Sequence, residues 1–269
     1  MKDLEQKYEH LKEIIKSYGS VLVAFSGGVD STFVLKAAVD ALKEKAVAVT
    51  ITGELYPPGE TEEAARLARF LGAEHIIIEN RDLDNPTFAS NPPDRCYHCK
   101  KNEYGEILKV ARERGFNAVI DGLNADDLSD YRPGIRAGQE LGVHSPLKDA
   151  GLTKEEIRAL SRNFGLPTAD KPSNPCLASR FPYGTQITSE GLRQVGAAEV
   201  ILRKMGIPQV RVRHHGNLAR IEVPEEYLQF VAERAAEVDR SLKGLGYTYV
   251  ALDLLGYRAG SMNEALRLT

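Results

Sequence analysis

Residues 26–31, Ser-Gly-Gly-Val-Asp-Ser, have the residue types and spacing of an anion-binding turn. An apolar run precedes them and a helical pattern follows, so the turn should join a strand to a helix. The two glycines allow a sharp turn whose N–H groups approach an anion, and the helix N-terminus adds a partial positive charge. A carboxylate there suits Mg²⁺ bridging two phosphates, because it would otherwise repel them. We therefore assign pyrophosphate and Mg²⁺ binding to Ser26, Gly27, Gly28, Asp30 and Ser31; the alternative is a glycine-rich turn without a ligand.

Two later segments could complete this site. Residues 121–127, Asp-Gly-Leu-Asn-Ala-Asp-Asp, follow another apolar run, which places the acidic pair that includes Asp126 at the same sheet edge. Lys148 precedes a further helical pattern, where it could neutralise charge developing on a leaving pyrophosphate. Asn-Asp turns and surface lysines are common, so each segment only supports the first.

Three cysteines supply the other reactive groups. Cys96 and Cys99 form a Cys-x-x-Cys motif at an expected helix entrance, with two prolines outside it and Asp94 as the cap. The helix dipole favours thiolates in the first turns, which suits metal ligation. The alternative is half of a zinc site whose other half comes from a partner.

Cys176 lies in a proline-rich segment, which should keep it out of a helix and present it on a loop. Lys171 and Arg180 are available to stabilise its thiolate. The alternative is an inert buried cysteine.

Hydrophobic periodicity predicts the elements that position these groups. A first amphipathic helix should end at Gly19, and four apolar runs then alternate with helical patterns. Strands are expected at residues 21–25, 46–51, 75–79 and 118–120, and helices near 31–43, 60–71, 99–114 and 153–163. The alternation predicts an α/β fold, a parallel sheet with helices on both faces, whose ligands bind at the carboxyl ends of the strands.

The pattern changes after residue 165, where four prolines mark an ordered functional loop. A small α+β domain should follow, with helices near 188–205 and 225–240 and strands at 209–213, 219–223 and 248–254. We divide the chain into a phosphate-loop domain at residues 1–170, a cysteine-bearing loop at 171–186 and a C-terminal substrate and assembly domain at 187–269.

The bulk composition narrows the function classes. With 269 residues, 42% of them hydrophobic, the chain can bury a substantial core. A net charge of -3 without Lys or Arg runs makes nucleic acid an unexpected partner. The charged first residues lack an apolar signal core and no run approaches the ~20 apolar residues of a membrane span, so we expect a cytoplasmic protein without a membrane partner. An odd cysteine count argues against a disulfide framework.

The string at residues 26–31 resembles the signature of the PP-loop ATP pyrophosphatases. That resemblance implies cleavage of ATP between the α and β phosphates and transfer of AMP to a carbonyl-type oxygen. With residues 124–127 and 130–134, and above all Cys-Leu-Ala-Ser-Arg at 176–180, essentially the whole chain resembles the LarE family. This family inserts sulfur during synthesis of the nickel-pincer nucleotide cofactor.

The family resemblance implies a defined reaction. A carboxylate of pyridinium-3,5-dicarboxylate mononucleotide is adenylated, sulfur attacks the acyl adenylate and AMP leaves. Repetition at the second carboxylate gives the bisthiocarboxylate mononucleotide, which later accepts nickel.

The family divides over the source of sulfur. Members with only the cysteine matching Cys176 give up its sulfur, whereas members with the Cys-x-x-Cys pair as well are thought to hold an iron–sulfur cluster. Because Cys96, Cys99 and Cys176 are all present, we expect them to hold a 4Fe-4S cluster whose open iron carries an extra sulfide.

The implied substrate carries a phosphate and two carboxylates and therefore needs cationic partners. We assign catalytic roles to Asp30, Cys176 and Arg180. Arg211 and Arg213 alternate along an expected strand, so both side chains could engage one anion, with Glu199 available to orient them. The alternative is a solvated strand face.

Two other functions remain open from the sequence. PP-loop proteins also thiolate tRNA, some with three cysteines, although the net charge counts against it. The second open function is that of a non-catalytic module that senses a nucleotide or a metal. The family resemblance also suggests a homo-oligomer and a downstream nickel-insertion protein as a partner.

Overall fold

The computed structural model describes residues 2–129, 133–258 and 260–262, and it divides into two compact units. The first unit comprises Met1–Gly53, Gly59–Asp82 and Asp94–Asn174. The second comprises Glu54–Pro58, Leu83–Pro93 and Pro175–Thr269. Residues 130–132, part of one sequence motif, lie outside the described residues.

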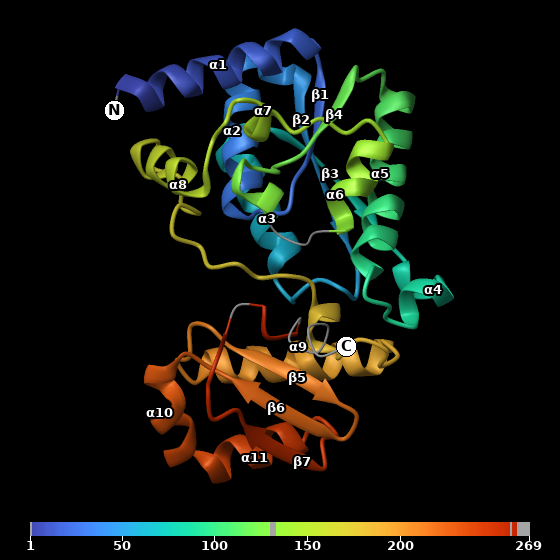
Figure 1. The fold of residues 1–269 in the computed structure, drawn as a ribbon, viewed down its shortest axis with the longest axis vertical. Coiled ribbons are helices and arrows are strands. Elements are labelled where there is room, and N and C mark those ends of the chain that lie inside the picture. Colours follow the sequence, from blue (N-terminus) through green and yellow to red (C-terminus); the bar gives the residue numbers. More distant parts are fainter. Residues whose placement is uncertain (1, 130–132, 259, 263–269) are drawn as a thin grey trace. The chain divides into compact units, whose positions relative to one another are not determined.

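A four-stranded parallel sheet with the order β3-β2-β1-β4 forms the centre of the first unit (Figure 1). The strands are β1 (Val21–Ala24), β2 (Ala46–Thr52), β3 (Glu74–Glu79) and β4 (Ala118–Ile120). β1, β2 and β4 are almost entirely buried, which explains their continuous apolar sequences. All four predicted strands are confirmed.

The order of the strands creates a place for a ligand. The chain passes from β1 to β2 to β3 in one direction and then returns to place β4 on the other side of β1. The carboxyl ends of β1 and β4 therefore flank a topological switch point, where ligands bind in open α/β sheets. The phosphate loop (residues 26–31) follows β1, and residues 121–127 follow β4.

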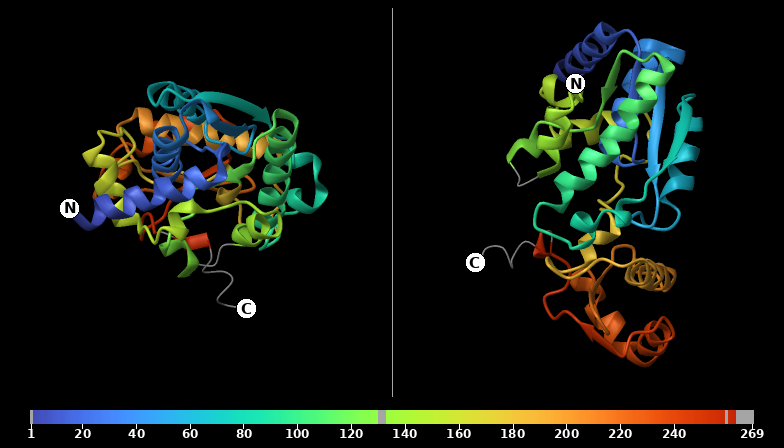
Figure 2. Two further views of the ribbon diagram at one scale, coloured as in Figure 1. Left: turned by 90° about the horizontal axis from the view of Figure 1, so that it is seen from above. Right: turned by 90° about the vertical axis from the view of Figure 1, so that its right-hand side faces the viewer.

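Helices surround this sheet, as the sequence predicts (Figure 2). They are α1 (Lys2–Tyr18), α2 (Val29–Leu42), α3 (Glu60–Phe70), α5 (Arg95–Arg114), α6 (Pro133–Glu140), α7 (Pro146–Asp149) and α8 (Lys154–Asn163). α2 contacts both α1 and α8, whereas α5 contacts β1, β4 and α6. Asp94 occupies the N-cap position of α5, as predicted, but its side chain makes no capping hydrogen bond.

The second unit contains a three-stranded mixed sheet with the order β5-β6-β7. Its strands are β5 (Arg211–His215), β6 (Leu218–Glu222) and β7 (Tyr249–Leu252), and its helices are α4 (Pro86–Ala89), α9 (Ser189–Lys204), α10 (Leu228–Glu233) and α11 (Ala235–Lys243). β5 pairs antiparallel with β6 through a turn at Gly216, and β6 pairs parallel with β7. Buried side chains of α9, α11 and the strands form its core.

Two expectations for the second unit are wrong in detail. The helix expected at 225–240 is interrupted at Arg234, whose backbone is not helical and which ends α10. The Arg234 guanidinium donates to the Phe230 carbonyl within α10. The proline-rich loop contains one turn of 3₁₀ helix at Leu177–Arg180, directly after Cys176. No helix among the described residues is long and apolar enough to cross a membrane.

Candidate active site

The phosphate loop borders a cavity of about 290 Å³ at the switch point. The cavity is lined by Ala24, Ser26, Gly28, Asp30, Ser31, Lys100, Tyr104, Asp121, Gly122, Leu123 and Asp127. Its volume lies near the lower end of the range for small-molecule pockets, roughly 300 to 1,000 Å³. The structure therefore gathers most of the residues assigned to phosphate and Mg²⁺ binding around one cavity.

The loop is ordered by its own serines. Gly27 has a φ of +69°, a conformation that favours glycine, and packs beside Ala64 rather than lining the cavity. The hydroxyl of Ser31 accepts from the backbone N–H of Ser26 and lies 3.0 Å from the Ser26 hydroxyl. Because Ser31 is also buried, it supports the loop as well as lining the cavity.

Asp30 is held by contacts to both of its carboxylate oxygens. Its Oδ2 atom is 2.5 Å from Lys154 Nζ, and its Oδ1 atom accepts from the Asn124 amide. Asp121 and Asp127 line the same cavity, so three carboxylates are available there. Oxygen donors of this kind fit Mg²⁺, which prefers one or two carboxylates together with substrate phosphates.

Two residues that the sequence analysis assigned to the phosphate site, Asp126 and Lys148, do not line the cavity. Asp126 is exposed and accepts from the Lys154 backbone N–H at the start of α8. Lys148 pairs with Asp149 at 3.3 Å, and neither Lys148 nor Asp126 is among the described residues that line the cavity. Lys100 lines the cavity and Lys154 binds Asp30. These two lysines therefore occupy the position beside the phosphate loop that the sequence analysis assigned to Lys148.

The Cys-x-x-Cys pair lies on α5 of the first unit. Cys96 is exposed, whereas Cys99 is partly buried and donates through its thiol to Glu103 Oε1 at 3.1 Å. Burial raises the pKa of the neighbouring Asp82 carboxyl, although the Asn102 amide and the nearby Cys99 thiol act in the opposite direction. Cys99 therefore lies beside two carboxyl groups, those of Asp82 and Glu103, which the Cys-x-x-Cys motif alone does not indicate.

Cys176 belongs to the second unit and is partly buried. The backbone N–H of the next residue, Leu177, donates to the Leu55 carbonyl, and the Arg180 guanidinium donates to the Pro175 and Cys176 carbonyls. These bonds fix the backbone that carries the thiol. Lys171, in the first unit, is engaged by Glu60 and Glu63, each at 2.9 Å.

Arg180 and Glu199 form a buried ion pair in the second unit. The Arg180 side chain is 0% exposed and binds both Glu199 oxygens, at 2.7 and 2.8 Å. Arg203 and the Val212 N–H also donate to Glu199. Burial disfavours the Glu199 charge, but these hydrogen bonds and neighbouring arginine charges hold its pKa below the ordinary value.

Arg211 and Arg213 are buried, so the alternative of a solvated strand face is wrong. Arg213 donates to Glu222 at 2.6 Å and to the Ser179 carbonyl. Burial and the Arg180 charge lower the pKa of Arg211 to about 10. Arg180, Arg203 and Arg211 thus all act on the single carboxylate of Glu199.

The fold and the phosphate loop define a PP-loop enzyme that uses ATP, and relatives of this class match the chain. A family model described as NAD synthase matches residues 4–114. A tRNA-specific 2-thiouridylase of Rickettsia conorii is 26% identical over 58% of the chain and 52% of its own length.

Some relatives match almost the whole chain. The pyridinium-3,5-bisthiocarboxylic acid mononucleotide synthase of Lactiplantibacillus plantarum is 41% identical over 99% of the chain and 97% of its own length. An uncharacterized protein of Synechocystis sp. is 45% identical over 98% of the chain and 99% of its own length. The chain therefore belongs to the LarE family and is an ATP-dependent sulfurtransferase.

Proposed function

We propose that this enzyme adenylates a carboxylate of pyridinium-3,5-dicarboxylate mononucleotide with ATP and then exchanges AMP for sulfur. Two such rounds give the bisthiocarboxylate mononucleotide, the compound in the name of the Lactiplantibacillus relative. The observation that carries this proposal is a phosphate loop at the switch point of a chain that matches that relative from end to end.

The residues of the first unit support the adenylation step. The substrate carboxylate would attack the α phosphorus of ATP, and the bond to the β phosphate would break to release pyrophosphate. Backbone N–H groups of the loop, the hydroxyls of Ser26 and Ser31 and the Lys100 ammonium can stabilise the phosphate charge. Asp30, with Asp121 or Asp127, would hold Mg²⁺, which lowers the repulsion between the phosphates and the attacking carboxylate.

The three cysteines support the sulfur step. Thiolates are the protein ligands of iron–sulfur clusters, and three of them leave one iron open. We propose that Cys96, Cys99 and Cys176 hold a 4Fe-4S cluster, which when bound supplies sulfide for attack on the acyl carbon while AMP leaves. The exposed or partly buried thiols and the hydrogen bonds that fix the backbone at Cys176 suit this role.

The buried arginines of the second unit support recognition of the substrate's anionic groups. Arg211 and Arg213, which lie two residues apart on β5, are the candidates for contact with the substrate phosphate. Arg180 would then act through Glu199 and the Cys176 backbone instead of touching the substrate. We also propose, from the family likeness, a homo-oligomer in the cytoplasm that passes its product to a nickel-inserting protein.

Pyrophosphate release that depends on the added dicarboxylate mononucleotide tests this function. Asp30→Ala and Ser31→Ala should each lower the release rate by about 10²-fold, the usual loss when a transition-state charge partner is removed. Asp170→Ala is the matched control, because Asp170 is exposed and paired only at the surface with Arg162. Release stimulated by tRNA and not by the mononucleotide would instead support a tRNA-thiolating enzyme.

Gly122→Ala tests the closeness of the two loops at the switch point. A Cβ at this position would lie 2.9 Å from the Ser31 backbone nitrogen and 3.1 Å from the Asp30 carbonyl carbon. The phosphate loop would have to move, and misplacement by ~1 Å can cost about 10²-fold in rate. Pyrophosphate release should fall by that order, whereas Gly105→Ala on α5, where a Cβ meets nothing within 4 Å, should leave it unchanged. Equal rates for the two variants would contradict this geometry.

A further inference from the structure

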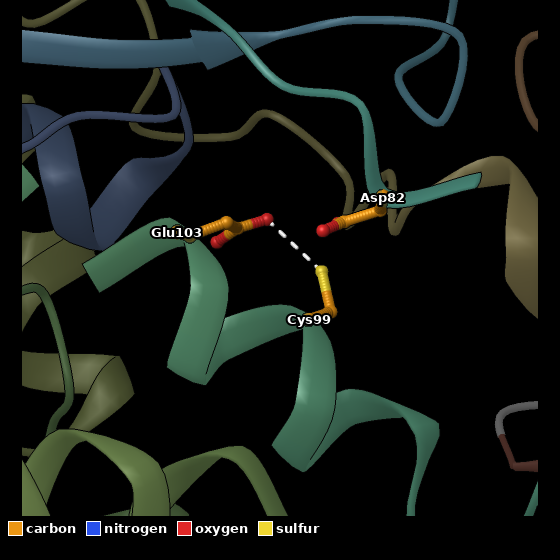
Figure 3. Close-up of side chains that lie close together, drawn as sticks. All are labelled: Asp82, Cys99 and Glu103. Carbon is orange, nitrogen blue, oxygen red and sulfur yellow. Dashed lines mark hydrogen bonds between the residues drawn. The ribbon is translucent and has the colours of Figure 1, made fainter. Parts of the chain in front are cut away.

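Cys99 has two acidic neighbours that the sulfur step does not use. Glu103 lies one turn further along α5, and Asp82 lies after β3 (Figure 3). Figure 3 shows the thiol and both carboxyl groups pointing toward one another. One ligand atom from each of the three residues lies within 4.8 Å of the others. Ligands at ~2.1 to 2.3 Å from a tetrahedral metal ion are ~3.6 Å apart, so this spacing fits one cation.

Burial makes the arrangement costly without a cation. Asp82 is 3% exposed and Glu103 is 5% exposed. Asp82 Oδ1 accepts from the Asn102 amide at 2.7 Å, but among the described residues Oδ2 is buried without a hydrogen-bond partner. A buried carboxylate oxygen in this state is costly, and a metal ion would satisfy it.

The local charges are also those of a cation site. Lys100 pairs with Glu103 Oε2 at 2.6 Å and balances one of the two carboxylates. Loss of the Cys99 proton, which now bonds to Glu103 Oε1, would leave a net charge of about −2. A divalent cation balances that charge and takes the place of the thiol proton.

We propose that Asp82, Cys99 and Glu103 bind a single divalent transition-metal ion of the Fe²⁺, Co²⁺ or Zn²⁺ type. One thiolate and two carboxylates form a mixed donor set, too soft for Mg²⁺ and too rich in oxygen for Cu⁺. The site does not depend on ATP or on the mononucleotide. Cys96 is not one of its ligands.

The proposed site shares Cys99 with the proposed cluster, so the two metal-bound states exclude each other. The single-ion site would be filled in protein that lacks the cluster. The bound ion would protect Cys99 from oxidation until the cluster is assembled, because a metal-bound thiolate is less available to react with oxidants.

Titration of anaerobic, chelator-treated full-length protein with Co²⁺ tests this proposal. The wild type should bind about one Co²⁺ per chain, with a near-ultraviolet thiolate-to-cobalt charge-transfer band and release of about one proton. Cys99→Ser should remove the band. Asp82→Asn and Glu103→Gln should each weaken binding by more than ~10-fold, since even residues outside the ligand shell commonly contribute 10- to 100-fold. Thermal melting of each variant checks that it is folded.

Cys96→Ser is the matched control, from the same motif and the same helix. It should bind Co²⁺ as the wild type does. Binding that is lost in Cys96→Ser and kept in folded Asp82→Asn would overturn the proposal in favour of a site built on the cysteine pair. Absence of the band in the wild type would overturn it as well. Neither outcome bears on adenylation, which is measured by pyrophosphate release.

Discussion

Arg180→Ala is expected to destabilise the second unit by about 3 to 5 kcal/mol, the usual cost of leaving one member of a buried ion pair alone. Arg180 is 0% exposed, and its removal leaves both Glu199 oxygens without their closest partner. The guanidinium bonds to the Pro175 and Cys176 carbonyls would be lost together with the ion pair. Urea unfolding at neutral pH should therefore show a large shift, and sulfur transfer should fail for a structural reason.

Arg203→Ala is the matched control, since Arg203 also pairs with Glu199 but its side chain is 29% exposed. It should cost no more than about 1 kcal/mol. The double variant Arg180→Met with Glu199→Leu should regain much of the lost stability, because apolar replacement of a buried pair is often neutral. A stable Arg180→Ala protein with lost sulfur transfer would show instead that Arg180 acts on the substrate.

The pH dependence gives this prediction a sign. The folded pKa of Glu199 is held below its ordinary value, so its stabilising effect is present above the unfolded pKa and is lost as the pH falls through the folded pKa. Without Arg180 the buried carboxyl should have a raised pKa and gain from protonation. The stability difference between wild type and Arg180→Ala should therefore shrink as the solution becomes acidic.

Cys176→Ser is expected to abolish thiocarboxylate formation while pyrophosphate release continues. Both sulfur routes need this thiol, as a cluster ligand or as the sulfur donor, and serine cannot replace a thiolate in either role. In the proposed function adenylation uses the phosphate loop, which belongs to the first unit, whereas Cys176 belongs to the second. Chromatography of the products should show AMP and pyrophosphate but no thiocarboxylate.

Cys96→Ser separates the two sulfur routes. If a cluster carries the sulfur, this variant should lose multiple turnovers, because one of three ligands is missing. Single-turnover product from Cys96→Ser, equal to that of the wild type, would show that the Cys-x-x-Cys pair is not needed. Thiocarboxylate from Cys176→Ser would contradict a role for Cys176 in either route.

The fold of the first unit could be predicted from sequence because its signals are local. The strand before the phosphate loop is a continuous apolar run, the glycines mark the turn, and Phe33 and Leu35 continue into a buried helix. Parallel strands buried on both faces leave few other arrangements for such a pattern. The position of residues 121–127 at the same edge followed from the direction of the strands.

The side-chain partners could not be predicted, because they depend on contacts between distant residues. Lys154 reaches Asp30 across 124 positions, and no spacing rule links them. Asp82 meets Cys99 only because the chain after β3 passes α5. Alternation correctly suggested that Arg211 and Arg213 share a strand face, but alternation does not distinguish a buried ionic face from a solvated one.

Mass spectrometry of the chain and its products, after reaction of anaerobically reconstituted protein with ATP, free sulfide and the dicarboxylate mononucleotide, tests the central claim most directly. We predict bound iron, several thiocarboxylates formed per chain and an unchanged mass for the peptide that contains Cys176. Dehydroalanine at position 176, with at most one sulfur transferred per chain and no bound iron, would contradict the cluster-based mechanism.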